Sequence, residues 1–281
     1  MVPRRGFHAQ SVVKALTKQR ASRFCNWQKA ARALMLDKKA AIVYCIARRG
    51  AYNGSRGIPF QSIDGEIGMI RELVFIVSGY LMGGILFARL AAALLRRPGI
   101  VQASEDGNPG TANAFQYGGA LCGVITLLGD LNKGFWPLYF YQKSGGNFDA
   151  RPLLSALVLM APVWGHAFPA QFHFQGGKGI AVTFGCLLGL CLATDTPLKA
   201  LAFFFLFFSL VLRVSPNFYR TGITYLCALA AILLLPCPTG VRLGFLGLTA
   251  AVLLRLHLSP EKREKLRIRF LWLEGRLPWA R

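Results

Sequence analysis

Residues 153–172 read LLSALVLMAPVWGHAFPAQF, and the glycine-rich sequence Gly176-Gly-Lys-Gly179 follows before another apolar stretch begins at Ile180. About 20 apolar residues are what an α-helix needs to cross the hydrocarbon of a bilayer. A lysine at the edge of the hydrocarbon is costly, and glycines there free backbone N–H groups to point at a ligand. An anionic ligand explains both features, and we expect a phosphate.

The composition excludes an ordinary soluble domain, because 54% of the 281 residues are hydrophobic, 16% are charged and the mean hydropathy is +0.42. Apolar stretches cover about residues 72–95, 117–141, 153–172, 180–193, 198–214, 219–235 and 241–256. The fourth and fifth are short for a crossing, so they are tilted, re-entrant or two halves of an interrupted pair. We predict an all-α polytopic membrane protein, a compact bundle of five to seven transmembrane helices.

Positive charge gathers at the two ends of the chain, whose net charge is +21. Residues 1–68 hold 13 Lys/Arg against 3 Asp/Glu, and residues 255–281 hold 8 against 3. Basic ends beside membrane spans indicate the cytoplasmic side and attraction to anionic headgroups, and nucleic acid is not expected as a partner. The seven cysteines are scattered without a C-x-x-C pair, which argues against a zinc site or a disulfide framework.

Three segments follow from this pattern: a basic extension over 1–68, a membrane domain over 69–260 and a basic cytoplasmic tail over 261–281, expected as a solvated helix on anionic headgroups. The charge of the extension would hold it in the cytoplasm, which conflicts with a cytoplasmic C-terminus after an odd number of spans. One resolution is that Met69 starts the protein and residues 1–68 are not translated; another is that they are disordered.

Asp130 and Lys133 lie three residues apart inside the second apolar stretch, so they share one face of a helix. Charges inside a span are functional candidates. The alternative is a self-neutralising ion pair that locks two helices together. Gly134 and Pro137 follow directly and favour a kink or a close helix approach at this point.

A polar segment, residues 102–116, joins the first two apolar stretches. Asn108-Pro-Gly110 is typical of a tight turn, and Thr111 and Asn113 are candidates to cap the next helix, which is a purely structural interpretation. The functional alternative is that the N-terminus of this helix, with its free N–H groups, faces a phosphate or an acyl carbonyl.

Three motifs in order give the chain a resemblance to the bacterial acyl-phosphate:glycerol-3-phosphate acyltransferase (PlsY) family, over roughly residues 70–260. Residues 106–113, DGNPGTAN, resemble the family's G-S-G-N-P-G-A-T-N, and residues 130–137, DLNKGFWP, resemble D-x-x-K-G-x-x-P. Residues 165–169, GHAFP, followed by residues 174–183, FQGGKGIAVT, resemble G-H-x-F-P and F-x-G-G-K-G-V-A-T. Residues 79–89 also resemble the family's first span.

The resemblance implies a multi-pass enzyme of the bacterial inner membrane with its active site facing the cytoplasm. It would move a fatty acyl group from acyl phosphate to the 1-hydroxyl of glycerol 3-phosphate, giving 1-acylglycerol 3-phosphate and phosphate in the first step of phospholipid synthesis. Acyl phosphate is then a co-substrate, and neither a cofactor nor a metal is expected. An acyl-phosphate synthase is a possible partner besides the bilayer.

The resemblance also implies roles for the motif residues, since the enzyme must hold two phosphates together against their repulsion. Lys133 and Lys178 would neutralise phosphate charge. The catalytic set would be Lys133, Lys178, Asn108 and His166, and the substrate-binding set Asp106, Gly110, Thr111, Asn113, Asp130, Gly176, Gly177 and Gly179. The proton of the hydroxyl could pass to a substrate phosphate or to His166, although an isolated histidine in a packed helix is more often structural.

Some positions depart from the family pattern. Asp106 stands where the family has serine, Thr111-Ala112 reverses its Ala-Thr, Gln116 replaces a usual arginine, and Arg255-Leu-His-Leu-Ser259 replaces R-H-x-x-N. Two other functions therefore stay open: a non-catalytic membrane binder or sensor of glycerol phosphate or acyl phosphate, and a small transporter of a phosphorylated solute.

Overall fold

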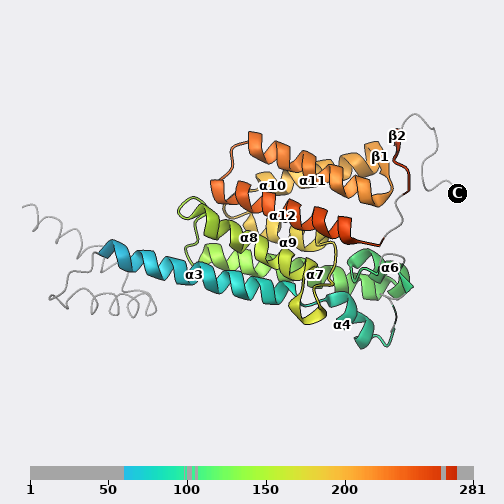
Figure 1. The fold of residues 1–281 in the computed structure, drawn as a ribbon, viewed down its shortest axis with the longest axis horizontal. Helices are drawn as coiled ribbons and strands as arrows, with labels where there is room; N and C mark the ends of the chain where they lie inside the picture. The colour runs from blue at the N-terminus through green and yellow to red at the C-terminus, as the bar shows by residue number, and fades with distance from the viewer. Residues whose placement is uncertain (1–59, 98, 100–102, 105–106, 261–263, 271–281) are drawn as a thin grey trace, which may run out of the picture. The chain divides into compact units, whose positions relative to one another are not determined.

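The computed structural model describes residues 60–97, 99, 103–104, 107–260 and 264–270 (Figure 1). From Gly65 onward the chain forms one compact unit. The elements in chain order are α3 (Phe60–Gly83), α4 (Phe87–Leu94), α6 (Thr111–Gly118), α7 (Ala120–Lys143), α8 (Pro152–Ala167), the 3-10 turn η1 (Ala170–Phe172), α9 (Ile180–Leu190), α10 (Thr196–Leu206), the π-helical turn η2 (Phe207–Val211), β1 (Leu212–Ser215), α11 (Asn217–Leu234), α12 (Thr239–Leu258) and β2 (Arg267–Phe270).

The predicted class is confirmed, because the described chain is mostly helical and has helices suited to a membrane. Among the described residues, three segments are long and apolar enough to cross, namely Pro152–Phe172, α11 and α12, and the broken pair α3 and α4 makes a fourth if it counts as one span. The apolar segments Ile180–Leu190 and Thr196–Val211 are shorter. The count of five to seven crossings stays a prediction, since α7 has 24 residues but carries several charges.

The first apolar stretch is not one helix, which corrects the predicted span over 72–95. It bends by 43° at the break between α3 and α4. A Cβ at Gly83 would overlap the carbonyl oxygen of Pro162 on α8, so the helix ends where α8 crosses it. Two carbonyl groups freed at the break accept side-chain hydrogen bonds: Gly84 from Gln171 at 2.6 Å and Ile85 from Lys133 at 2.6 Å. The break is therefore paired internally.

The close approach predicted at Gly134 is confirmed. A Cβ at this position would overlap the carbonyl oxygen of Val182, and one at Gly185 would overlap the carbonyl oxygen of Leu131. The glycines thus allow the backbones of α7 and α9 to touch, as small residues do at helix contacts in membranes. This contact brings the charges of α7 next to the glycine-rich loop that precedes α9.

The buried core lies mainly among α7, α8, α9, α11 and α12, and α8 packs along α12. Large apolar side chains cover the outside as well, for example Leu234, which is 85% exposed. Such a surface suits lipid contact.

The boundary predicted between residues 68 and 69 falls inside α3, which begins at Phe60. Most of the predicted extension, residues 1–59, lies outside the described residues.

Residues Arg267–Phe270 of the C-terminal tail form a strand, so the predicted helix is wrong there. β2 pairs antiparallel with β1, which follows α10 and η2 at the end of the fifth apolar stretch (Figure 1). The residues Arg267-Ile-Arg-Phe270 alternate between charged and apolar with the period of two that is typical of a strand, which does not fit the solvated helix that we expected.

Candidate active site

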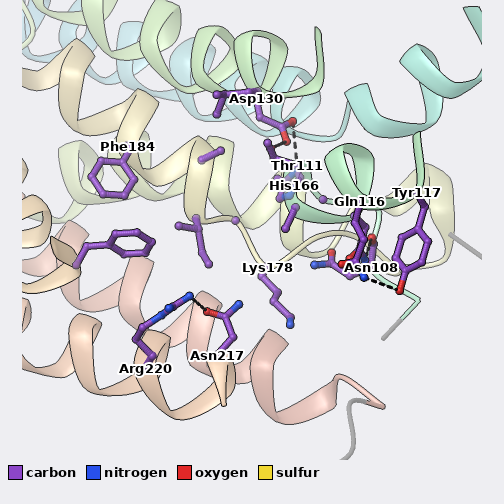
Figure 2. A pocket seen from close by; sticks show the side chains of 18 residues that line it. Asn108, Thr111, Gln116, Tyr117, Asp130, His166, Lys178, Phe184, Asn217 and Arg220 are labelled. Atoms are coloured by element: carbon purple, nitrogen blue, oxygen red, sulfur yellow. Dashed lines mark hydrogen bonds and ion pairs between the residues drawn. The ribbon is translucent and has the colours of Figure 1, made fainter. Parts of the chain in front are cut away.

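A cavity of about 630 Å³ opens among α6, α7, α9 and α11 (Figure 2). Its polar lining includes Asn108, Thr111, Asn113, Gln116, Tyr117, Asp130, His166, Lys178, Asn217 and Arg220. Leu127, Ile180, Phe184 and Phe205 give it an apolar part. In Figure 2, Asp130 and His166 lie on one side, Asn217 and Arg220 on the other, and Lys178 between them.

Asp130, Lys133 and His166 form one buried cluster at the wall of the cavity. The Nζ of Lys133 lies 2.8 Å from Oδ1 of Asp130 and 2.8 Å from Nδ1 of His166. Each of the three residues is about 2% exposed. Lys133 does not line the cavity, since its three donors point to Asp130, His166 and the carbonyl group of Ile85. It therefore cross-links α7, α8 and the broken end of α3.

The tautomer of His166 follows from this contact. An ammonium group has only donors, so Nδ1 of His166 accepts from Lys133. A neutral imidazole whose Nδ1 accepts carries its proton on Nε2. His166 can thus donate a hydrogen bond from Nε2, and it has no basic nitrogen left there.

The glycine-rich loop divides into an anchored half and a half that reaches the cavity. The N–H of Gly176 donates to the carbonyl of Ala167 at 3.2 Å, and the N–H of Gly177 donates to the carbonyl of His166 at 3.0 Å. These two glycines hold the loop against the end of α8 and do not line the cavity. Lys178 and Gly179 do line it, and Gly179 precedes α9 with a φ of 79°, a conformation that favours glycine.

Arg255 on α12 holds the same loop from the other side. Its Nε and Nη2 donate to the carbonyl oxygen of Gly176 at 3.0 Å and 2.7 Å. A guanidinium fork fixes both the distance and the direction of the peptide it binds. The altered terminal motif thus keeps an arginine that touches the glycine-rich loop.

The Asn108–Asn113 segment reaches the cavity through the start of α6, but the predicted caps are wrong. Gly110 is the N-cap, and no side chain caps the helix. Thr111 instead donates from Oγ1 to Oδ2 of Asp130 at 3.3 Å, and Nδ2 of Asn113 donates to the carbonyl of Asn108 at 2.8 Å. These bonds tie the first motif to the second. Asp106 lies outside the described residues.

The sequence analysis missed Asn217 and Arg220, at the start of α11. Nη2 of Arg220 donates to Oδ1 of Asn217 at 2.6 Å, and both side chains line the cavity. In the sequence these two residues appear only as polar residues at the start of the sixth apolar stretch. Nothing in the sequence relates this position to the three motifs. Tyr117 was also missed; its hydroxyl accepts from Nε2 of Gln116 at 3.3 Å.

The charges around the cavity favour an anion. Lys178 and Arg220 line it, and Asp130 is the one carboxylate among the described lining residues. Because Asp130 is paired with Lys133, it offsets little of this positive charge. Among the described residues no group of three His, Cys, Asp or Glu side chains could hold a metal ion.

Residues 73–264 match the family model described as glycerol-3-phosphate acyltransferase. A glycerol-3-phosphate acyltransferase of Azotobacter vinelandii is 40% identical over 114 residues, which cover 41% of this chain and 58% of that protein, just over half its length. One of Ralstonia pickettii is 34% identical over 182 residues, covering 59% of this chain and 86% of that protein.

The fold is similar to crystal structures of PlsY (YgiH), an integral membrane glycerol 3-phosphate acyltransferase. The glycerol 3-phosphate form superposes with a TM-score of 0.56 at 24% identity, over 66% of this chain and 88% of that one. The lysophosphatidic acid form gives 0.54 at 25% identity, over 66% and 87%.

Proposed function

Since this chain belongs to the glycerol-3-phosphate acyltransferase family, we propose that it transfers a fatty acyl group from acyl phosphate to the 1-hydroxyl of glycerol 3-phosphate. The products are 1-acylglycerol 3-phosphate and inorganic phosphate. The observation that carries this proposal is the cavity lined by Lys178, Arg220, the start of α6, Asp130 and His166, with Lys133 buried behind the last two. We place it in a bacterial inner membrane with the cavity open to the cytoplasm.

The proposed acyl transfer requires cations that neutralise the two phosphate groups more than it requires a strong base. The hydroxyl oxygen attacks the acyl carbon, the bond from that carbon to the phosphate oxygen breaks, and the leaving phosphate takes the hydroxyl proton. Acyl phosphate is an activated anhydride, so the enzyme's main contribution is to hold two phosphate groups together and to orient the hydroxyl.

Lys178 and Arg220 are the cations that can offset the charge of the two phosphate groups. Gln116 stands where the family usually has arginine, so one positive charge is missing on the α6 side of the cavity. Arg220 supplies a guanidinium on the opposite side, where Asn217 holds it. Its Nε is buried and forms no hydrogen bond to any described residue.

His166 acts as a donor in this scheme, because its Nδ1 is engaged by Lys133. An N–H from Nε2 can stabilise the oxyanion that forms when the hydroxyl attacks the carbonyl. Lys133 is then a positioning residue, since it acts through His166 and Asp130. Asn108, Thr111 and Asn113 set the start of α6 against Asp130, with its N–H groups available to a phosphate.

The test uses the full chain in nanodiscs with synthetic acyl phosphate and labelled glycerol 3-phosphate. We expect one phosphate released per ester formed, and a loss of about 100-fold or more in kcat/KM for Lys178→Ala. Lys199→Ala is the matched control, since this exposed lysine pairs with Asp195 on α10 and does not line the cavity.

Several results would oppose the proposal. Binding of glycerol 3-phosphate without turnover would favour a sensor, and passage of a phosphorylated solute across vesicles would favour a transporter. Equal turnover with an acyl thioester would refute acyl phosphate as the specific donor. Full activity of the Lys178→Ala variant would show that this lysine has no role in catalysis or substrate binding.

A further inference from the structure

The β1–β2 ribbon, residues Leu212–Ser215 and Arg267–Phe270, has two chemically different faces. Arg213 lies opposite Arg269, and Ser215 lies opposite Arg267. Residues directly opposite each other in an antiparallel pair point to the same face, and alternate residues share it. Three arginines therefore share one face.

Within the part of the chain that the structure describes, the arginine face has no partner of opposite charge. Like charges directly opposite each other destabilise a strand pair, and Arg213 and Arg269 occupy such positions. All three arginines are exposed, and none forms an ion pair with a carboxylate in the described part of the chain. An anion bound on this face would relieve the repulsion.

The other face is apolar and half open. Val214 on this face is 2% exposed, whereas Ile268 and Phe270 on the same face are 52% and 54% exposed. The chain that leads into β1 is also apolar and open, with Leu210 at 58%. Exposed apolar side chains next to a cationic face are typical of segments that lie at the boundary between hydrocarbon and headgroups.

We propose that the β1–β2 ribbon lies in the membrane surface and binds phosphate groups of anionic phospholipids through Arg213, Arg267 and Arg269. A guanidinium can bind phosphate in a bidentate manner. Each basic residue near an anionic membrane surface strengthens binding to that membrane about five-fold. β1 is joined by Pro216 to α11, whose Asn217 and Arg220 line the cavity. A lipid held on the ribbon thus sits beside the cavity. This inference does not depend on acyl transfer.

Hydrogen exchange of the full chain in nanodiscs tests the inference. The discs contain phosphatidylcholine alone or phosphatidylcholine mixed with phosphatidylglycerol, and the peptide that contains β2 is followed by mass spectrometry. We expect its amide exchange to slow about ten-fold in the anionic discs, because the bound lipid holds the strand pair closed. Native mass spectrometry should show phosphatidylglycerol retained on the protein.

In the double variant Arg267→Gln/Arg269→Gln, the β2 peptide should exchange at the same rate in both kinds of disc. In the control variant Lys199→Gln, which removes an exposed cation on α10, exchange should still be slower in the anionic discs. The variant Arg267→Lys/Arg269→Lys keeps the positive charges but loses the bidentate guanidinium groups, so it should keep part of the slowing in anionic discs. Unchanged exchange in α12 shows that each variant is folded. Equal exchange in both lipids, or a lipid effect that survives the glutamine variant, would overturn the proposal.

Two further experiments test other ligands for the ribbon, namely inorganic phosphate and a second copy of the protein. Inorganic phosphate added to phosphatidylcholine discs should leave β2 unchanged, so slowing by phosphate alone would refute a lipid as the source. Protection that grows with the number of protein copies per disc, and not with phosphatidylglycerol, would assign the ribbon to contact with a second copy.

Discussion

Two buried clusters contact α7 at Asp130 and at Tyr141, which are eleven residues and therefore about 16 Å apart along the helix axis. In the first, Asp130 pairs with Lys133 at 2.8 Å. In the second, Glu72 pairs with Arg151 at 2.9 Å and accepts from the hydroxyl of Tyr141 at 3.4 Å. Asp130 is 2% exposed and Glu72 is 1% exposed, so the burial of the carboxylate does not distinguish the clusters.

What distinguishes them is their surroundings. The Asp130 cluster forms the wall of a cavity that holds Lys178 and Arg220. The Glu72 cluster lines no part of that cavity, and the arginines around it, Arg71 and Arg151, are 26% and 29% exposed. A buried ion pair therefore indicates a site only when further donors face the same cavity. The Glu72 cluster fits a structural lock between α3, α7 and α8.

The largest effect is expected for Asp130→Asn. Lys133 then keeps a buried charge without a counter-ion, which costs about 3–5 kcal/mol of unfolding free energy. Turnover should fall by about 100-fold or more because His166 loses its orientation. The double variant Asp130→Asn/Lys133→Met should regain most of the stability but not the turnover. Thermal unfolding and the acyl-transfer assay measure the two effects, and recovery of turnover in the double variant would contradict this role.

A smaller effect, confined to stability, is expected for Glu72→Gln. Its arginine partners are about a quarter exposed, so water can solvate them when the carboxylate is removed. We expect the unfolding free energy to fall by about 1–2 kcal/mol, with turnover per folded molecule unchanged. Thermal unfolding and turnover normalised to folded protein provide the measurement. A loss of turnover larger than the loss of folded protein would show that the two clusters are alike.

The smallest effect is expected for Arg255→Met, which removes two hydrogen bonds to Gly176 without touching the cavity wall. A looser loop places Lys178 less well, so KM should rise about three-fold while kcat changes little. Arg255→Lys, which can restore one bond, should recover part of the affinity. Initial rates over a range of substrate concentrations separate the two constants. A fall in kcat at unchanged KM would place Arg255 in the chemical step.

The sequence predicted much of one side of the cavity. Asp130 and Lys133 share a helix face because of their spacing, and the glycine-rich loop and the Asn108 segment stand out by composition between apolar stretches. Asn217 and Arg220 could not be found in this way. They lie on α11, remote in sequence from the three motifs, and two polar residues at a helix start are common. The break between α3 and α4 was also hidden, because it depends on the backbone of α8.

By itself the sequence determined the membrane class, the helical period and the identity of the motifs, since apolar length, glycine content and charge spacing are local properties. The tertiary structure decided which motif residues meet. It turned Lys133 toward Asp130, His166 and the carbonyl group of Ile85, assigned Gly176 and Gly177 to anchoring the loop, and placed Arg220 across the cavity from Asp130. These outcomes depend on contacts between segments far apart in the chain, and no local pattern encodes them.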